Sequence, residues 1–239
     1  MINTLRKKCG MACSSFHLFD DNDKIVIPID ADKFKLTLAG WMQYKIKKTT
    51  SKPTIKYIHF YASNEPDPIT KQILDEFSEQ HQFSIEYVHH QDINSTKELY
   101  DMYIEQADLN NFNKIAISDT IEAINCSILS KMCDAGVFDG PDPKQEISIK
   151  NEEKLYIIRP FCYCLERDID NYMKKNNLKS HLGGIFVTPT KSFEASRDAL
   201  ETLNSESTNI HINFFSSQFQ VDSLYIGDGD GKAHEIDDI

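Results

Sequence analysis

The stretch Asp23–Leu38, DKIVIPIDADKFKLTL, indicates the fold of this chain. Its first half is rich in β-branched residues and its second half carries apolar residues at helical spacing, which predicts a strand, a tight turn and a helix. In an α/β protein this turn lies at the carboxyl end of the strand, where such folds place their ligands. Glycines and small hydroxyl residues usually form a phosphate site there, because backbone N–H groups must approach the anion. This turn instead contains Asp30 and Asp32 and no glycine, so its position favours a nucleotide site and its side chains oppose one.

Segments of the same two kinds alternate along the rest of the chain. Further strands are expected at 54–61, 83–88, 114–117 and 155–159, and helices at 2–16, 34–46, 68–77, 95–108, 121–134, 165–175 and 191–203. This alternation predicts an α/β fold with a doubly wound, mostly parallel five-stranded sheet and helices on both faces. We expect residues 1–203 to form one α/β domain and residues 204–239 an irregular acidic segment. The Gly/Pro/Asp-rich segment 136–151 is expected to be a loop.

The amino-acid composition of the chain argues against several classes of function. The 239 residues contain six cysteines and no export signal at the N-terminus, which indicates reduced thiols in a cytoplasmic protein. No apolar run approaches the ~20 residues needed to span a bilayer, so no membrane partner is expected. The net charge of −11 opposes general nucleic-acid binding, since phosphate contacts supply most of that affinity. A cluster of lysines between Lys45 and Lys56 is interpreted as a solvated surface.

Three segments resemble the PP-loop ATP pyrophosphatases, and within them the tRNA 2-thiocytidine synthetase family. The first segment runs from residues 5–8 through the strand at 23–27. The second is Asn113–Ile117 with the helix that follows it. The third and most specific is IIRPFCYCLERDI at 157–169, which is similar to an Ile-Arg-Pro run of the family. The resemblance implies an adenine nucleotide α-hydrolase-like fold. It also implies an enzyme that activates a tRNA cytidine with ATP and inserts sulfur by iron–sulfur chemistry.

The family's phosphate loop reads Ser-Gly-Gly-x-Asp-Ser. On this chain its positions fall on Asp30, Ala31, Asp32, Lys33, Phe34 and Lys35. Glycine lets backbone approach a phosphate closely, whereas Ala31 and Asp32 place side chains in that space. A carboxylate about 4 Å from a phosphate costs roughly 1–4 kcal/mol. Lys33 and Lys35 offset part of this charge but do not restore the amide cradle. The alternative interpretation is a capped turn, because aspartate is a good helix N-cap.

Two further motifs of the family are altered. Its Gly-His-His-x-Asp-Asp-x-x-Glu-Thr motif falls on residues 118–127, where both histidines are replaced and Ser118 and Glu122 remain as candidate nucleotide contacts. Its first Cys-x-x-Cys falls on Asp92 and Ser95, and its second falls in a region without cysteine. An iron–sulfur cluster needs about three or four thiolates, so none is expected. ATP with magnesium is the one cofactor that the resemblance leaves open.

The joint change of three motifs favours a pseudoenzyme with no catalytic residues and no metal ligands. Such a protein would bind or scaffold, in a homodimer or beside an active paralogue. The alternative is an active ATP-dependent tRNA-modifying enzyme of 2-thiocytidine type, in which Lys33 and Lys35 replace the amide cradle. A third hypothesis is an unrelated small-molecule binder on the same sheet, because function resides in the site and not in the fold.

Overall fold

One mixed sheet forms the centre of the molecule. The computed structural model describes residues 2–48, 52–90, 93–148, 154–185 and 187–219. Within these residues, six strands are arranged in the order β3-β2-β1-β4-β6-β5. They are β1 (Lys24–Pro28), β2 (Thr54–Tyr61), β3 (Ile85–His89), β4 (Lys114–Ala116), β5 (Lys144–Ser148) and β6 (Lys154–Ile158). All neighbouring strands are parallel except β5, which is antiparallel to β6.

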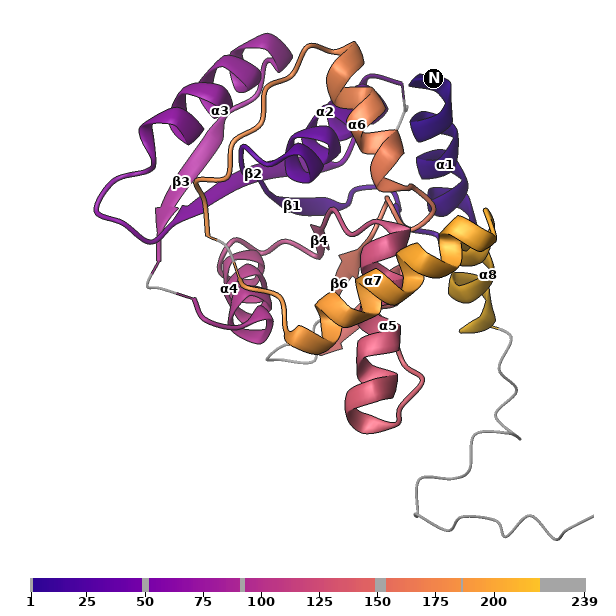
Figure 1. The fold of residues 1–239 in the computed structure, drawn as a ribbon. Helices are drawn as coiled ribbons and strands as arrows, with labels where there is room; N and C mark the ends of the chain where they lie inside the picture. The colour runs from indigo at the N-terminus through magenta and orange to yellow at the C-terminus, as the bar shows by residue number, and fades with distance from the viewer. Residues whose placement is uncertain (1, 49–51, 91–92, 149–153, 186, 220–239) are drawn as a thin grey trace, which may run out of the picture.

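Helices cover both faces of this sheet. They are α1 (Ile2–Ser15), α2 (Lys33–Lys48), α3 (Pro68–His81), α4 (Thr96–Leu109), α5 (Ile121–Ala135), α6 (Glu166–Lys175), α7 (Lys191–Glu206) and α8 (Ile210–Ser217). Ile25 and Ile27 of β1 pack in one apolar cluster with α1, α2, α3 and α6, whereas Val26 packs in a second cluster with α4. Successive side chains of a strand point to opposite faces, so the two clusters lie on opposite sides of the sheet. Figure 1 shows α2 and α6 on one side of the strands and α4 on the other. The expected doubly wound architecture is confirmed.

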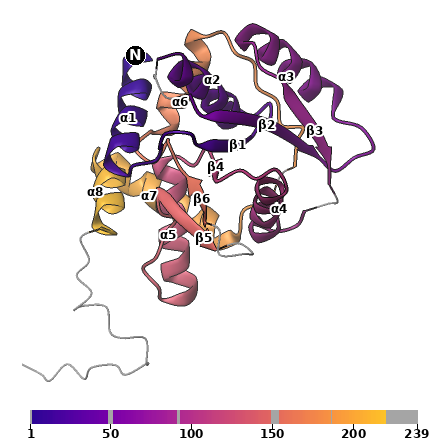
Figure 2. The same cartoon turned by 180° about the vertical axis from the view of Figure 1, so that it is seen from behind.

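Two expectations of irregular structure are wrong. Strand β5 lies inside the expected loop 136–151 and adds a sixth strand at the edge of the sheet (Figure 2). It carries a single large apolar residue, Ile147, and gains its hydrogen bonds from β6, so it has little sequence signal of its own. Helix α8 lies inside the expected irregular segment 204–239, where it contacts α5 and α7 and buries Phe215. Residues 220–239 lie outside the described residues.

The strand order reverses between β1 and β4. From β1 the chain continues to β2 and β3 on one side, and then returns to β4 on the other side of β1. The turn after β1 leads into α2, and the turn after β4 leads into α5. Loops that leave adjacent strands at such a switch point diverge and form a crevice. The two segments that the sequence singled out therefore meet at the carboxyl edge of the sheet.

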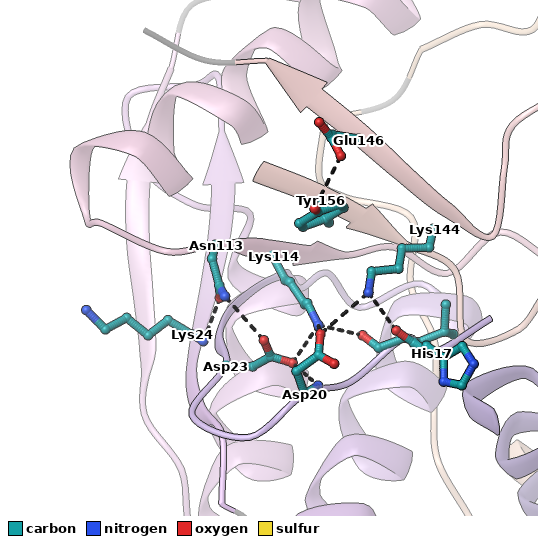
Figure 3. Close-up of polar contacts among 10 residues, drawn as sticks. His17, Asp20, Asp23, Lys24, Asn113, Lys114, Lys144, Glu146 and Tyr156 are labelled. Carbon is teal, nitrogen blue, oxygen red and sulfur yellow. Dashed lines mark hydrogen bonds and ion pairs between the residues drawn. The ribbon is translucent and has the colours of Figure 1, made fainter. Parts of the chain in front are cut away.

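A buried lysine stabilises the opposite, amino edge. Lys114 is 1% exposed, and its Nζ donates to the Leu18 carbonyl at 3.0 Å, to Asp20 at 2.8 Å and to Asp23 at 2.7 Å. Asn113 donates to the other oxygen of Asp23 at 3.2 Å (Figure 3). A charge is tolerated in the interior when it is paired and hydrogen-bonded. This network holds the turn between α1 and β1 against β4.

Candidate functional site at the switch point

A pocket of about 800 Å³ lies at the switch point. Its wall is formed by the start of α2, the turn before α5, the start of α6, residues 180–185 and α7. Of the residues expected from the sequence, the pocket is lined by Asp30, Asp32, Lys33, Phe34, Lys35 and Ser118. Ala31 and Glu122 do not line it. Ala31 is a fully buried residue of the turn, and Glu122 accepts a hydrogen bond from the backbone N–H of Glu166 at 3.0 Å.

The Asp32 side chain accepts hydrogen bonds from backbone amides of the turn. Its Oδ1 accepts hydrogen bonds from the backbone N–H groups of Phe34 and Lys35, both at 2.9 Å. The first-turn amides of a helix have no intrahelical acceptor and are the donors that a bound anion would use. In this structure, a carboxylate of the chain itself satisfies two of them. The turn is therefore capped, as the second interpretation of the sequence predicted.

Lys35 is paired within the same turn. Its Nζ lies 3.3 Å from a carboxylate oxygen of Asp32 and 3.6 Å from one of Asp30. Burial lowers the pKa of Lys35, but the nearby Asp32 and Asp30 carboxylates contribute to a net rise, so the lysine stays charged. Burial raises the pKa of Asp30, whose Oδ1 also accepts the Ala31 N–H at 2.7 Å.

Lys33 points to a different set of carboxylates. Its Nζ lies 2.8 Å from Asp170 and 3.6 Å from Glu166, both on α6. Burial lowers the pKa of Lys33, and the contacts with Asp170 and Glu166 outweigh this effect and raise it overall. Neither of the two lysines expected to replace the amide cradle is free, because each already neutralises acidic groups of the chain.

Residues 180–185, called the covering segment below, lie across the turn. The His181 N–H donates to the Ala31 carbonyl at 2.8 Å, and its imidazole lies 3.3 Å from Asp67 at the start of α3. A Cβ on Gly184 would lie 1.7 Å from Asp30 Oδ2, so glycine is required for this approach. In Figure 1 this segment runs in orange from α6 past the ends of the strands towards α7. The sequence indicates no helix or strand between 175 and 191, and its one signal of this role is the adjacent pair Gly183 and Gly184, because adjacent glycines permit close backbone approach.

The turn before α5 is also held by internal contacts. Asp119, at the position of the family's first histidine, accepts a hydrogen bond from Arg159 Nε at 3.0 Å and one from the Tyr100 hydroxyl at 3.3 Å. Thr120 caps α5 through the N–H of Ala123. Asp119 and Thr120 line the pocket and were not expected to do so. Their side chains fix the wall of the pocket.

The cysteine positions that the resemblance implies do not fit an iron–sulfur cluster. Asp92 lies outside the described residues, and the Ser95 hydroxyl caps α4 by accepting the Glu98 N–H at 3.2 Å. In the part of the chain that the structure describes, no group of three or more His, Cys, Asp or Glu residues is placed to hold a metal ion.

Comparison with known proteins identifies solved structures that have a similar fold. No family model and no curated protein sequence matches this chain. Among solved structures, the chain is similar to the U34-tRNA thiolase NcsA from Methanococcus maripaludis, which carries a [4Fe-4S] cluster. That match has a TM-score of 0.73 at 13% identity and covers 92% of this chain and 78% of the thiolase.

A second similar structure is FMN adenylyltransferase from Candida glabrata, in complex with FMN and an ATP analogue. Its TM-score is 0.50 at 12% identity, covering 82% of this chain and 73% of the other. Within the described ranges, no helix is long and apolar enough to cross a membrane.

The sequence identities of 13% and 12% with these two solved structures are low enough to show the fold alone. The chain has the α/β fold of the PP-loop, adenine nucleotide α-hydrolase-like proteins, as the resemblance in its sequence implied.

Proposed function

We propose that this protein is a PP-loop-fold pseudoenzyme that acts by binding or scaffolding and does not cleave ATP. Its phosphate turn is a self-capped structural turn, and the pocket beside it binds a ligand without a pyrophosphate group. We expect it to act in the cytoplasm, because all six cysteines are free thiols. Its partner would be a second copy of the chain or an active relative.

One observation carries this proposal: the Asp32 carboxylate already accepts the two amides that would cradle a phosphate, at 2.9 Å each. A pyrophosphate would have to displace this carboxylate and leave it unpaired beside its own negative charge. Repulsion of this kind costs roughly 1–4 kcal/mol for each close pair of charges. Gly184 also lies close against the Asp30 carboxylate, which leaves less room for an anion beside the turn.

Isothermal titration with ATP and magnesium tests the proposal. We expect no heat of binding at millimolar nucleotide and no release of AMP on prolonged incubation. Micromolar binding together with AMP release would overturn the proposal. Light scattering of the same sample reports whether the chain is a homodimer.

The similarity to a tRNA thiolase fold supports one alternative, an active ATP-dependent tRNA-modifying enzyme with an altered phosphate turn. This function requires a basic path to the pocket. Three lysines of the cluster, Lys45, Lys47 and Lys48, lie instead in the last turn of α2, which starts at the pocket with Lys33. At about 1.5 Å per residue, these three lysines lie roughly 18–23 Å from Lys33 along the helix, towards the amino edge of the sheet.

Retardation of tRNA at low salt distinguishes the two functions. A tRNA-modifying enzyme would bind with an affinity that falls steeply as salt rises, because each phosphate contact releases counterions. The pseudoenzyme proposal predicts no retardation. A retarded complex that dissociates with increasing salt, together with ATP turnover, would favour the alternative.

A further inference from the structure

Two buried cysteines from distant parts of the chain lie in contact. Cys9 belongs to α1 and Cys164 precedes α6, 155 positions later, and their sulfur atoms are 3.6 Å apart. Both residues are fully buried in the first apolar cluster and both are free thiols. Neither residue lines the switch-point pocket. Ligand binding in the pocket therefore does not explain why these two thiols lie in contact.

The backbone on both sides of the pair is fixed. Lys8, the neighbour of Cys9, forms an ion pair of 2.6 Å with Asp168 on α6. The same Asp168 oxygen accepts the N–H of Leu165 at 2.9 Å, and the N–H of Cys164 donates to the Phe161 carbonyl at 2.7 Å. Helix α1 and the loop before α6 are thus held side by side. The two sulfur atoms need to close to about 2.0 Å to bond, a movement of the ends of two side chains.

We propose that Cys9 and Cys164 form an intramolecular disulfide when the protein is exposed to hydrogen peroxide. One sulfur attacks peroxide, the O–O bond breaks, and a sulfenic acid and one water result. The sulfur of the other cysteine then attacks the sulfenic sulfur and expels a second water. The two thiols together lose two electrons and two protons, and one peroxide is reduced to two waters.

Burial keeps the pair reduced until an oxidant enters. Burial raises the pKa of Cys9, and the contact with Cys164 raises it further, so the reactive thiolate is scarce at neutral pH. Oxidation therefore proceeds during local opening of α1. Cys133 on α5 is exposed and serves as an internal reference, because peroxide reaches it freely.

The disulfide would tether α1 to one wall of the pocket. The Cys164 carbonyl accepts the N–H of Ile121 at 3.1 Å, at the first residue of α5. That residue directly follows the pocket-lining Thr120. Oxidation would thus connect the N-terminal helix covalently to the segment that positions the turn before α5.

Peptide mapping of the full-length protein tests the proposal. The folded protein is treated with hydrogen peroxide, alkylated, denatured and digested with trypsin without reductant. We expect peptide 9–24 joined to peptide 155–167, with fragment ions that place the bond on Cys9 and Cys164. Dithiothreitol should separate the two peptides. Absence of the link at a peroxide dose that fully oxidises Cys133 would overturn the proposal.

Matched variants locate the bond, because each of these peptides contains a second cysteine. Cys9→Ala and Cys164→Ala should abolish the link, whereas Cys13→Ala and Cys162→Ala should retain it. A link that survives Cys9→Ala, or a bond that the wild-type fragment ions place on Cys13 or Cys162, refutes the assignment. The wild-type fragment ions decide the question even if a variant does not fold.

Discussion

Replacement of Lys114 by methionine tests whether the network at the amino edge stabilises the fold. The substitution keeps the apolar stem of the side chain and removes an ammonium group that donates to three acceptors at 2.7–3.0 Å. Asp23, whose side chain is 2% exposed, is then left as a buried charge without its cation. Loss of one partner from a buried ion pair costs about 3–5 kcal/mol. This is a large share of a typical unfolding free energy of roughly 5–15 kcal/mol.

Urea denaturation followed by circular dichroism measures this loss. With an m-value of about 3 kcal/mol per M of urea, the midpoint of unfolding should fall by roughly 1 to 1.7 M. Lys144→Met is the matched control, because Lys144 donates to the His17 carbonyl at 2.7 Å and contacts Asp20 at 3.5 Å, both at the exposed end of the network, and such surface interactions contribute about 1 kcal/mol or less. Addition of Asp23→Asn to Lys114→Met should recover part of the stability. Equal midpoints for the two methionine variants would refute the reasoning.

Three further predictions concern the switch point. Asp30→Ser with Asp32→Gly frees the capped amides and should strengthen binding of inorganic pyrophosphate about tenfold by calorimetry, equivalent to about 1.4 kcal/mol. Asp32→Asn, which keeps a cap, should show no gain, and equal gains would contradict the mechanism. Burial raises the pKa of Glu122, so its stabilising protonated form is lost as pH rises through the folded pKa. The urea midpoint of the wild type should therefore fall between about pH 4 and pH 7 by more than that of Glu122→Gln. Gly184→Ala should destabilise the protein by about 1–3 kcal/mol in the same assay, since its Cβ would overlap Asp30. Gly10→Ala in α1 should instead stabilise it by up to about 1 kcal/mol, and like effects would contradict the close contact.

Local patterns in the sequence determined most of the elements. The periodicity of apolar residues predicted the helices of the α/β domain and five of the strands, because burial of one face imposes this spacing. The caps also followed from local chemistry. Asp67 accepts the Thr70 N–H before α3 and Ser95 accepts the Glu98 N–H before α4, and aspartate and serine are both common N-cap residues. The resemblance in three segments identified the fold that the structure has.

Local sequence patterns determined the candidate site only in part. The sequence placed Asp30, Asp32 and Ser118 at strand ends, and these residues do line the pocket. It did not indicate that Lys33 pairs with Asp170, 137 positions away. Contacts of this kind depend on how α2 packs against α6, and no local pattern encodes that arrangement.

Tertiary structure decided what the turn after β1 does. The sequence left two interpretations open, a weakened phosphate site and a capped helix start. The choice depended on where the Asp32 carboxylate points and on the covering segment, which brings Gly184 against Asp30 from about 150 positions further along the chain. Propensity and spacing act over a few residues, whereas the sheet order sets which distant segments meet. For that physical reason the sequence determined the turn itself, and only the folded chain determined that its amides are already occupied.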